Sequence, residues 1–137
     1  MIETVVLAAL LQPESKYEVP ARYEAYEVCV RERESNGRWD AVSPSGTYLG
    51  AYQMTQALGE GATWHMTEDI IEYSKAKNKK QARVRAEILR DTPVNEWDPW
   101  AQTSAFVQTL DGHDQEEAWS GASHWAGGRW HCGKDGR

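Results

Sequence analysis

The chain has 137 residues, a hydrophobic share of 40% and a formal net charge of −6, which suit one domain with a single modest core. Long blocks of Lys or Arg are absent, so we expect no nucleic-acid partner and no membrane attachment, because both need a basic surface. Seven Trp and six Tyr against one Phe weakly favour a glycan ligand, since sugar rings pack on flat aromatic faces; a Trp-rich core is equally consistent.

The first 20 residues predict an N-terminal arm or anchor ahead of one domain over residues 21–137. The apolar run from Val5 to Leu11 is too short to span a bilayer. We expect no signal peptide, because Glu3 rather than Lys or Arg precedes this run. Such an arm packs on its own domain or on a neighbouring protein, and the sequence leaves both open.

Residues 21–35 carry apolar side chains at helical spacing, and Pro20 suits the start of a helix. The pair Asn36–Gly37 predicts its end, because both residue types accept left-handed backbone readily. We therefore expect a helix whose last turn carries Glu34.

Residues 38–56 are rich in turn-forming residues and show little periodic pattern. Ser43-Pro44-Ser45-Gly46 predicts a turn. Residues 47–49 are interpreted as a brief strand, and residues 50–54 as a return strand or the start of a helix. The expected result is a short β-like hairpin.

Residues 67–90 have a helical pattern that begins at Thr67, a good capping residue, and breaks at Asn78. The basic cluster at this break is interpreted as a solvated face, with wall binding as the less favoured alternative; it comprises Lys75, Lys77, Lys79 and Lys80.

Asp98-Pro99 predicts the start of another helix, which Gly112 stops. We expect a short last helix over residues 115–120 and an irregular tail over residues 121–137. These elements predict a mainly α domain with a small β-like hairpin.

Glu34 stands one turn after Val30 and shares its inward face, whereas Glu32 should be exposed. The negative end of the helix and partial burial both disfavour an ionised carboxylate. A general acid that works near neutral pH needs such an environment. A salt-bridged surface glutamate is the simpler interpretation of this segment taken alone.

Two motifs follow each other in this region: residues 34–39 are ESNGRW and residues 45–54 are SGTYLGAYQM. The pair resembles motifs of the lysozyme-like transglycosylase superfamily, in particular the resuscitation-promoting-factor (transglycosylase-like) family. That family has an ESGGNW-type motif and then an aromatic-Gly-Gly-Leu-Gln-Phe type motif. Residues 125–133, WAGGRWHCG, resemble its closing Trp and Cys region. The resemblance is good over residues 26–56, weaker over 98–132 and absent over 1–20.

The resemblance implies an α+β lysozyme-like domain that cleaves the β-1,4 bond between N-acetylmuramic acid and N-acetylglucosamine in peptidoglycan. We expect no metal and no other cofactor. Glu34 matches the family's single catalytic acid/base, and Gln53 matches the polar residue that faces the sugar. The other residues that we expect at the substrate are Tyr48, Thr47, Gly50, Trp39 and Trp125.

The chain departs from the family at Arg33, where a Cys often precedes the catalytic Glu and pairs with the C-terminal Cys. Cys29 lies one helix turn earlier, so the resemblance implies a shifted disulfide between Cys29 and Cys132. Arg33 also opposes the effects that favour a protonated Glu34.

The step after protonation of the leaving oxygen is open. A water assisted by a second carboxylate leads to hydrolysis, whereas attack by the muramyl 6-hydroxyl gives an anhydro product. Asp40 is the nearest second carboxylate, but we interpret it as a turn residue and slightly favour the single-carboxylate transglycosylase route. His124, His131 and Cys132 lack a fourth ligand, so no zinc site is expected.

The ending SHWAGGRW at residues 123–130 resembles domains carried by phages of actinobacteria, often in tail proteins. This implies a virion or extracellular cell-wall location, with peptidoglycan strands as partners and possible contacts of the arm with other tail proteins. The alternative from a different class is a virion structural or glycan-binding module that keeps the fold but does not cleave.

Overall fold

The computed structural model describes residues 14–112 and 117–137, and its described residues are mainly helical, as expected. Among them, extended pairing is limited to two isolated antiparallel bridges, Val42 with Leu49 and Leu49 with Met54. The helices, with η for 3-10 helices, are η1 (Ala21–Tyr23), α2 (Glu24–Ser35), α3 (Gln56–Thr63), α4 (Thr67–Ser74), α5 (Lys79–Arg90), η2 (Val94–Glu96), α6 (Pro99–Leu110) and η3 (Ser120–Trp125).

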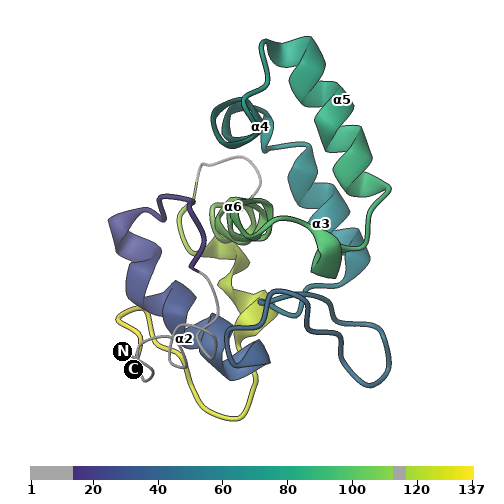
Figure 1. The fold of residues 1–137 in the computed structure, drawn as a ribbon. Coiled ribbons are helices and arrows are strands. Elements are labelled where there is room, and N and C mark those ends of the chain that lie inside the picture. The colour runs from purple at the N-terminus through teal and green to yellow at the C-terminus, as the bar shows by residue number, and fades with distance from the viewer. Residues whose placement is uncertain (1–13, 113–116) are drawn as a thin grey trace, which may run out of the picture.

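Helix α6 passes through the middle of the molecule, and every residue from Ala101 to Leu110 is buried (Figure 1). Helices α3 and α4 pack against it on one side and η3 on the other. Pro99 occupies its first turn after Asp98, as the sequence predicts, although the Asp98 side chain makes no capping hydrogen bond. A helix buried on all faces holds the remaining elements in place from within.

Helix α2 ends where the sequence predicts, because Asn36 and Gly37 adopt left-handed backbone with φ of 55° and 79°. Within residues 67–90 the expected break at Asn78 is confirmed, and the Asn78 side chain accepts a hydrogen bond from the Gln81 amide. Thr67, by contrast, is the first residue of α4 rather than its cap, which is Met66.

Two predictions about the remaining helices were wrong or incomplete. Helix α3 was missed, because Gly59 and Gly61 interrupt its pattern. The expected last helix over residues 115–120 is displaced: η3 begins only at Ser120, and residues 113–116 lie outside the described part of the chain. The buried backbone of Gly121 approaches the Thr109 carbonyl of α6 so closely that an added Cβ would lie 1.8 Å from its oxygen.

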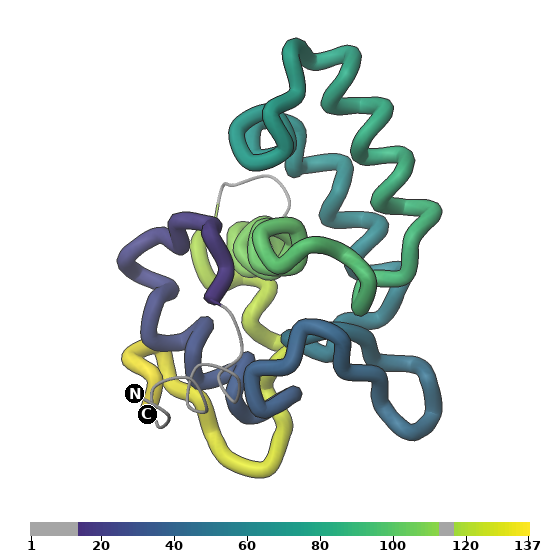
Figure 2. The backbone as a smooth tube through the Cα atoms, in the orientation of Figure 1, coloured from purple at the N-terminus to yellow at the C-terminus, as the bar shows by residue number. Residues whose placement is uncertain are grey.

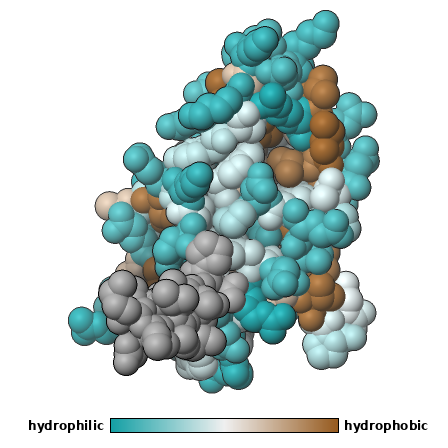
Figure 3. All heavy atoms as spheres, viewed as in Figure 1, coloured by the Kyte–Doolittle hydropathy of each residue, from teal (hydrophilic) through white to brown (hydrophobic). Residues whose placement is uncertain are grey.

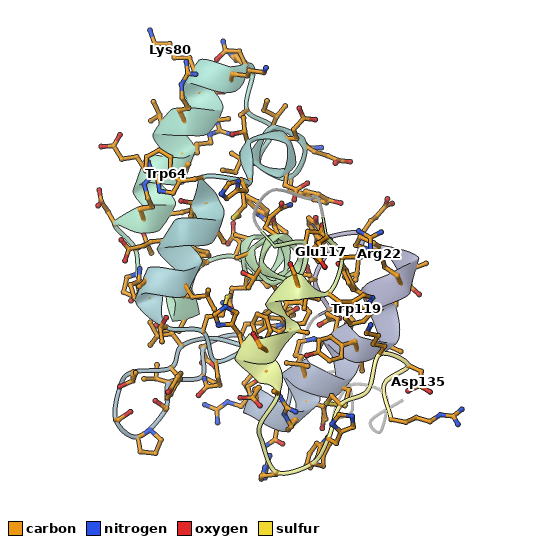
Figure 4. The ribbon with its side chains drawn as sticks, turned by 180° about the vertical axis from the view of Figure 1, so that it is seen from behind. Arg22, Trp64, Lys80, Glu117, Trp119 and Asp135 are labelled. Atoms are coloured by element: carbon orange, nitrogen blue, oxygen red, sulfur yellow. A yellow bond between two sulfur atoms is a disulfide. The ribbon has the colours of Figure 1, made fainter. Side chains whose placement is uncertain are left out.

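The C-terminal tail runs back beside α2, where the Cys29–Cys132 disulfide is confirmed (Figure 2). Trp119, just before η3, adds a second contact in this region by packing edge-on against Tyr23 and Tyr26 (Figure 4). The tail is thereby held to the helix that carries Glu34.

Residues 14–20, the described part of the expected arm, lie on the domain. The Tyr17 hydroxyl donates to Asp69 of α4 at 2.8 Å, and the Tyr73 hydroxyl accepts from the Glu18 amide. The surface seen in Figure 3 is mostly hydrophilic, with apolar side chains along α5, where Val84 and Ile88 are exposed. In the described ranges, every helix is too short or too polar to cross a membrane.

Candidate functional site

A surface hollow of about 350 Å³ lies where the end of α2, the turn around residues 48–53 and the tail meet. It brings together four residues that the sequence predicts at the substrate: Glu34, Tyr48, Gln53 and Trp125. The complete lining is Arg33, Glu34, Tyr48, Gln53, His124, Trp125, Gly127, Gly128 and Arg129.

A second hollow, of about 320 Å³, continues the first toward α3. The two share Tyr48, Gln53, His124 and Trp125, and the second adds Met54, Thr55, Ala57 and Leu58. The two adjoining hollows are together called the groove. Its lining combines aromatic and polar side chains, which suits sugar rings, because these have apolar faces and polar rims.

A larger hollow, of about 620 Å³, lies between residues 14–19 and the start of α2. It contains none of the motif residues, so size alone does not make it the functional site.

Glu34 reaches the groove from the last turn of α2, and its side chain is 23% exposed. Its Oε2 accepts a 2.7 Å hydrogen bond from Arg33 Nε, while within residues 14–112 and 117–137 its Oε1 accepts none. Glu32 is exposed, as expected. One carboxylate oxygen of Glu34 is therefore held by an ion pair, and the other is available to a ligand.

Arg33 is buried and joins the end of α2 to the tail. Besides its ion pair with Glu34, it donates to the carbonyls of Trp125 at 2.7 Å and Trp130 at 3.1 Å. The loop can approach this closely because Gly128 has no side chain: an added Cβ would lie 2.4 Å from Arg33 Nε. From the sequence, the charge of Arg33 was expected to disfavour a protonated Glu34. In the structure Arg33 also connects the end of α2 to the tail.

The turn that carries Tyr48 and Gln53 is held from below by Gln102 of α6, which the sequence did not single out. Its Oε1 accepts from the Ala51 amide at 2.9 Å, and its Nε2 donates to the carbonyls of Trp39 and Trp97. Gly50 lies against it with φ of 80°, and a Cβ there would be 2.3 Å from Gln102 Oε1. Gly50 lines neither hollow, so it is not placed at the substrate as expected; it belongs to the turn that carries Tyr48 and Gln53.

Gln53 also has left-handed backbone, with φ of 53°, and its Nε2 donates to the Gly50 carbonyl at 3.0 Å. Ser35 Oγ donates to the Ala51 carbonyl at 2.8 Å, which ties the end of α2 to this turn. Gln53 and Glu34, which come from these two linked segments, both line the first hollow.

Besides Gly50, three sequence candidates lie away from the groove lining. Trp39 is a core residue that packs edge-on against Tyr52. Thr47 is exposed and lines neither hollow. Asp40 is 79% exposed and pairs with Arg38 at 3.7 Å, which agrees with its interpretation as a turn residue.

Trp125 is mostly buried: its ring packs edge-on against Phe106, and its Nε1 donates to the Tyr52 carbonyl. Cys132 is in the disulfide. Among the described residues, no group of three His, Cys, Asp or Glu side chains lies close enough to hold a metal ion.

Among the polar side chains that line the first hollow, sequence reasoning did not single out His124 and Arg129. Both belong to the tail, where no periodic pattern indicates which side chains face inward. The available signal was their position on either side of Trp125 and the glycine pair in the segment that resembles the family's closing region.

Comparison with known proteins adds no assignment: no protein-family model, curated protein or solved structure matches the chain.

Proposed function

We propose that this chain carries a lysozyme-like domain that cleaves the β-1,4 bond between N-acetylmuramic acid and N-acetylglucosamine, with Glu34 as its acid/base. The observation that carries the proposal is the convergence of Glu34, Tyr48, Gln53 and Trp125 on one hollow, although they come from three separate segments of the chain. The proposed setting is a phage tail or the bacterial cell wall, as the tail motif suggests.

The acidic content of the groove supports the single-carboxylate route. Glu34 is the only Asp or Glu among the described residues that line either hollow, and Asp40 lies outside both. Hydrolysis through paired carboxylates requires a second one within roughly 5–9.5 Å. With one carboxylate, Glu34 first protonates the leaving oxygen and then removes the proton of the muramyl 6-hydroxyl, which closes the anhydro ring.

One observation favours the alternative, a glycan-binding module without activity. The Arg33–Glu34 ion pair occupies one carboxylate oxygen, as in a purely structural glutamate. The groove suits both functions, so whether the glycosidic bond is cleaved is what distinguishes them.

The deciding experiment compares clearing of purified peptidoglycan by the wild-type protein and by Glu34→Gln. We expect the variant to lose at least about 100-fold in rate, the usual cost of removing a general acid–base group. Glu32→Gln is the matched control, because Glu32 lies on the same helix and is exposed; it should clear like the wild type. Mass spectrometry of the released muropeptides should show anhydro ends.

Equal clearing by wild type and Glu34→Gln would contradict the role of Glu34. No clearing by any of the three proteins, together with retained binding to the wall, would favour the glycan-binding module. Reducing ends in place of anhydro ends would keep the cleavage but reject the transglycosylase route.

A further inference from the structure

Arg129 has a fixed position in the groove. Its Nη2 donates to the carbonyl of Arg33, the residue just before Glu34, at 3.1 Å. Its guanidinium carbon lies 5.2 Å from the centre of the Trp130 ring, a cation–π arrangement. Two contacts therefore hold the guanidinium beside the hollow that contains Glu34.

The two arginines of this hollow differ in how their charge is neutralised. Arg33 is buried and paired with Glu34 at 2.7 Å. Arg129 is exposed and, within residues 14–112 and 117–137, has no carboxylate within ion-pair distance. Because Arg33 already neutralises the only acidic side chain of the lining, Arg129 leaves the hollow with one uncompensated positive charge.

This local charge contrasts with the whole chain, whose formal net charge is −6. An acidic protein gains no long-range attraction to an anionic polymer. A fixed guanidinium at the site itself still recognises a carboxylate, because its planar donors match the two carboxylate oxygens.

From these contacts we infer that Arg129 forms a carboxylate subsite that selects acidic glycans over neutral ones. The ligand is a glycan with a carboxylate near the bond held at Glu34: either the lactyl carboxylate of a muramyl sugar or a carboxylate of the peptide attached to it. The inference rests on the proposed function, because it makes Arg129 the specificity determinant of that same site.

The test measures binding by calorimetry, with three ligands of matched glycan length. They are the neutral disaccharide chitobiose, the N-acetylglucosaminyl-N-acetylmuramic acid disaccharide with a free lactyl carboxylate, and the same disaccharide with a dipeptide amide-linked to the lactyl group. We expect wild type to bind at least one acidic ligand about 10-fold more tightly than chitobiose, the usual gain from a charge-assisted contact. The preferred acidic ligand identifies which carboxylate is recognised.

Arg129→Gln should reduce this preference to about 1-fold, and Arg129→Lys should retain part of it, because Lys keeps the charge and loses the planar donors. Arg38→Gln is the control: Arg38 is an exposed arginine outside the groove, so the same change of charge should leave the preference intact. Equal binding of all three ligands by wild type, absence of binding, or a preference that persists in Arg129→Gln would each overturn the inference.

The binding test is independent of cleavage, because none of the three ligands has to be turned over. Clearing by wild type with no ligand preference would reject the role of Arg129 and leave the proposed function standing. A ligand preference without clearing would support the role of Arg129 and reject the proposed cleavage.

Discussion

The two halves of the molecule on either side of α6 are stabilised in different ways (Figure 1). The half with α3, α4 and α5 is regular: its helices pack through small and apolar side chains such as Ile70, Ala82 and Ala86. The half with α2, the turns of residues 38–55 and the tail has little regular structure beyond α2 and η3. Its segments are joined by cross-links: a disulfide, the Arg33 side chain and hydrogen bonds to irregular backbone.

This difference explains where the groove lies. Regular helices pair their own backbone groups, so the surface between them is readily filled by packed side chains. Turns and loops leave backbone groups and side chains free to converge from distant parts of the chain. The convergence of Glu34, Gln53 and Arg129 therefore depends on the cross-linked half, and loss of a cross-link should affect the groove before it affects α3–α5.

Removal of the disulfide should have the largest effect on the free energy of unfolding. The bond joins residues separated by 103 positions, so the Cys29→Ser/Cys132→Ser double variant should lose about 4–5 kcal/mol of unfolding free energy in the chain-entropy model. Urea unfolding of both proteins measures this loss. Hydrogen exchange should rise more in the tail than in α5.

Reductant supplies the control for this prediction. It should destabilise the wild type toward the level of the double variant and leave the double variant unchanged. If α5 loses protection as early as the tail, the two halves unfold as one unit and do not differ in how they depend on the disulfide.

Gly50→Ala should have the next largest effect, with Gly46→Ala as its matched control. Both glycines have left-handed φ, 80° and 77°, which costs about 1 kcal/mol for alanine. Only at Gly50 does the new Cβ meet Gln102, at 2.3 Å from Oε1, whereas nothing lies within 4 Å at Gly46. We expect a loss of about 2–3 kcal/mol for Gly50→Ala against about 1 kcal/mol for Gly46→Ala, measured by urea unfolding.

The difference between the two variants isolates the close contact with Gln102. Equal losses would show that Gln102 moves aside freely, and that α6 does not hold the turn around Gly50.

The contrast between the halves also accounts for what the sequence could predict of the fold. Helices with clear ends were placed well: α2 ends at Asn36, α5 begins after Asn78, and α6 begins at Pro99. Helix α3 was missed because its two glycines disguise the pattern, and η3 was misplaced because a 3-10 turn has no strong periodic signature.

The candidate site was predictable only where motifs exist. The motifs around Glu34 and Gln53 predicted two residues of the groove lining, and the tail motif predicted Trp125. Gln102 looked like an ordinary helix residue, since its hydrogen bonds cross to partners at positions 39 and 51. Long-range contacts of this kind, like the exposed position of Arg129, arise only when the chain is folded.

Tyr17→Phe tests the helical half and should have the smallest effect. Its hydroxyl donates to Asp69 at 2.8 Å, but Asp69 also accepts from Ser104 Oγ at 2.7 Å and Gln108 Nε2 at 3.2 Å. Because two donors remain, the variant should lose only about 1 kcal/mol of unfolding free energy at pH 8.

The pH dependence of this loss has a definite sign. Burial, followed by the charge and the hydrogen bond of Asp69, raises the pKa of Tyr17 above its ordinary 10.0. Below pH 10 the phenol is protonated in both folded and unfolded chains. Above pH 10 the Tyr17 phenol ionises in the unfolded chain but keeps its proton in the folded chain. The contribution of the Tyr17 hydroxyl to wild-type stability therefore falls as pH rises. Phenylalanine does not titrate, and the other tyrosines are common to both proteins.

The gap between wild type and Tyr17→Phe should therefore narrow between pH 9 and pH 11 in urea unfolding, with the circular dichroism of the helices as the signal. A constant gap would mean that Tyr17 is equally easy to ionise in the folded and unfolded chains. In that case the Tyr17 hydroxyl would not be held against Asp69 in solution, and the polar link between α4 and α6 would depend on Ser104 and Gln108 alone.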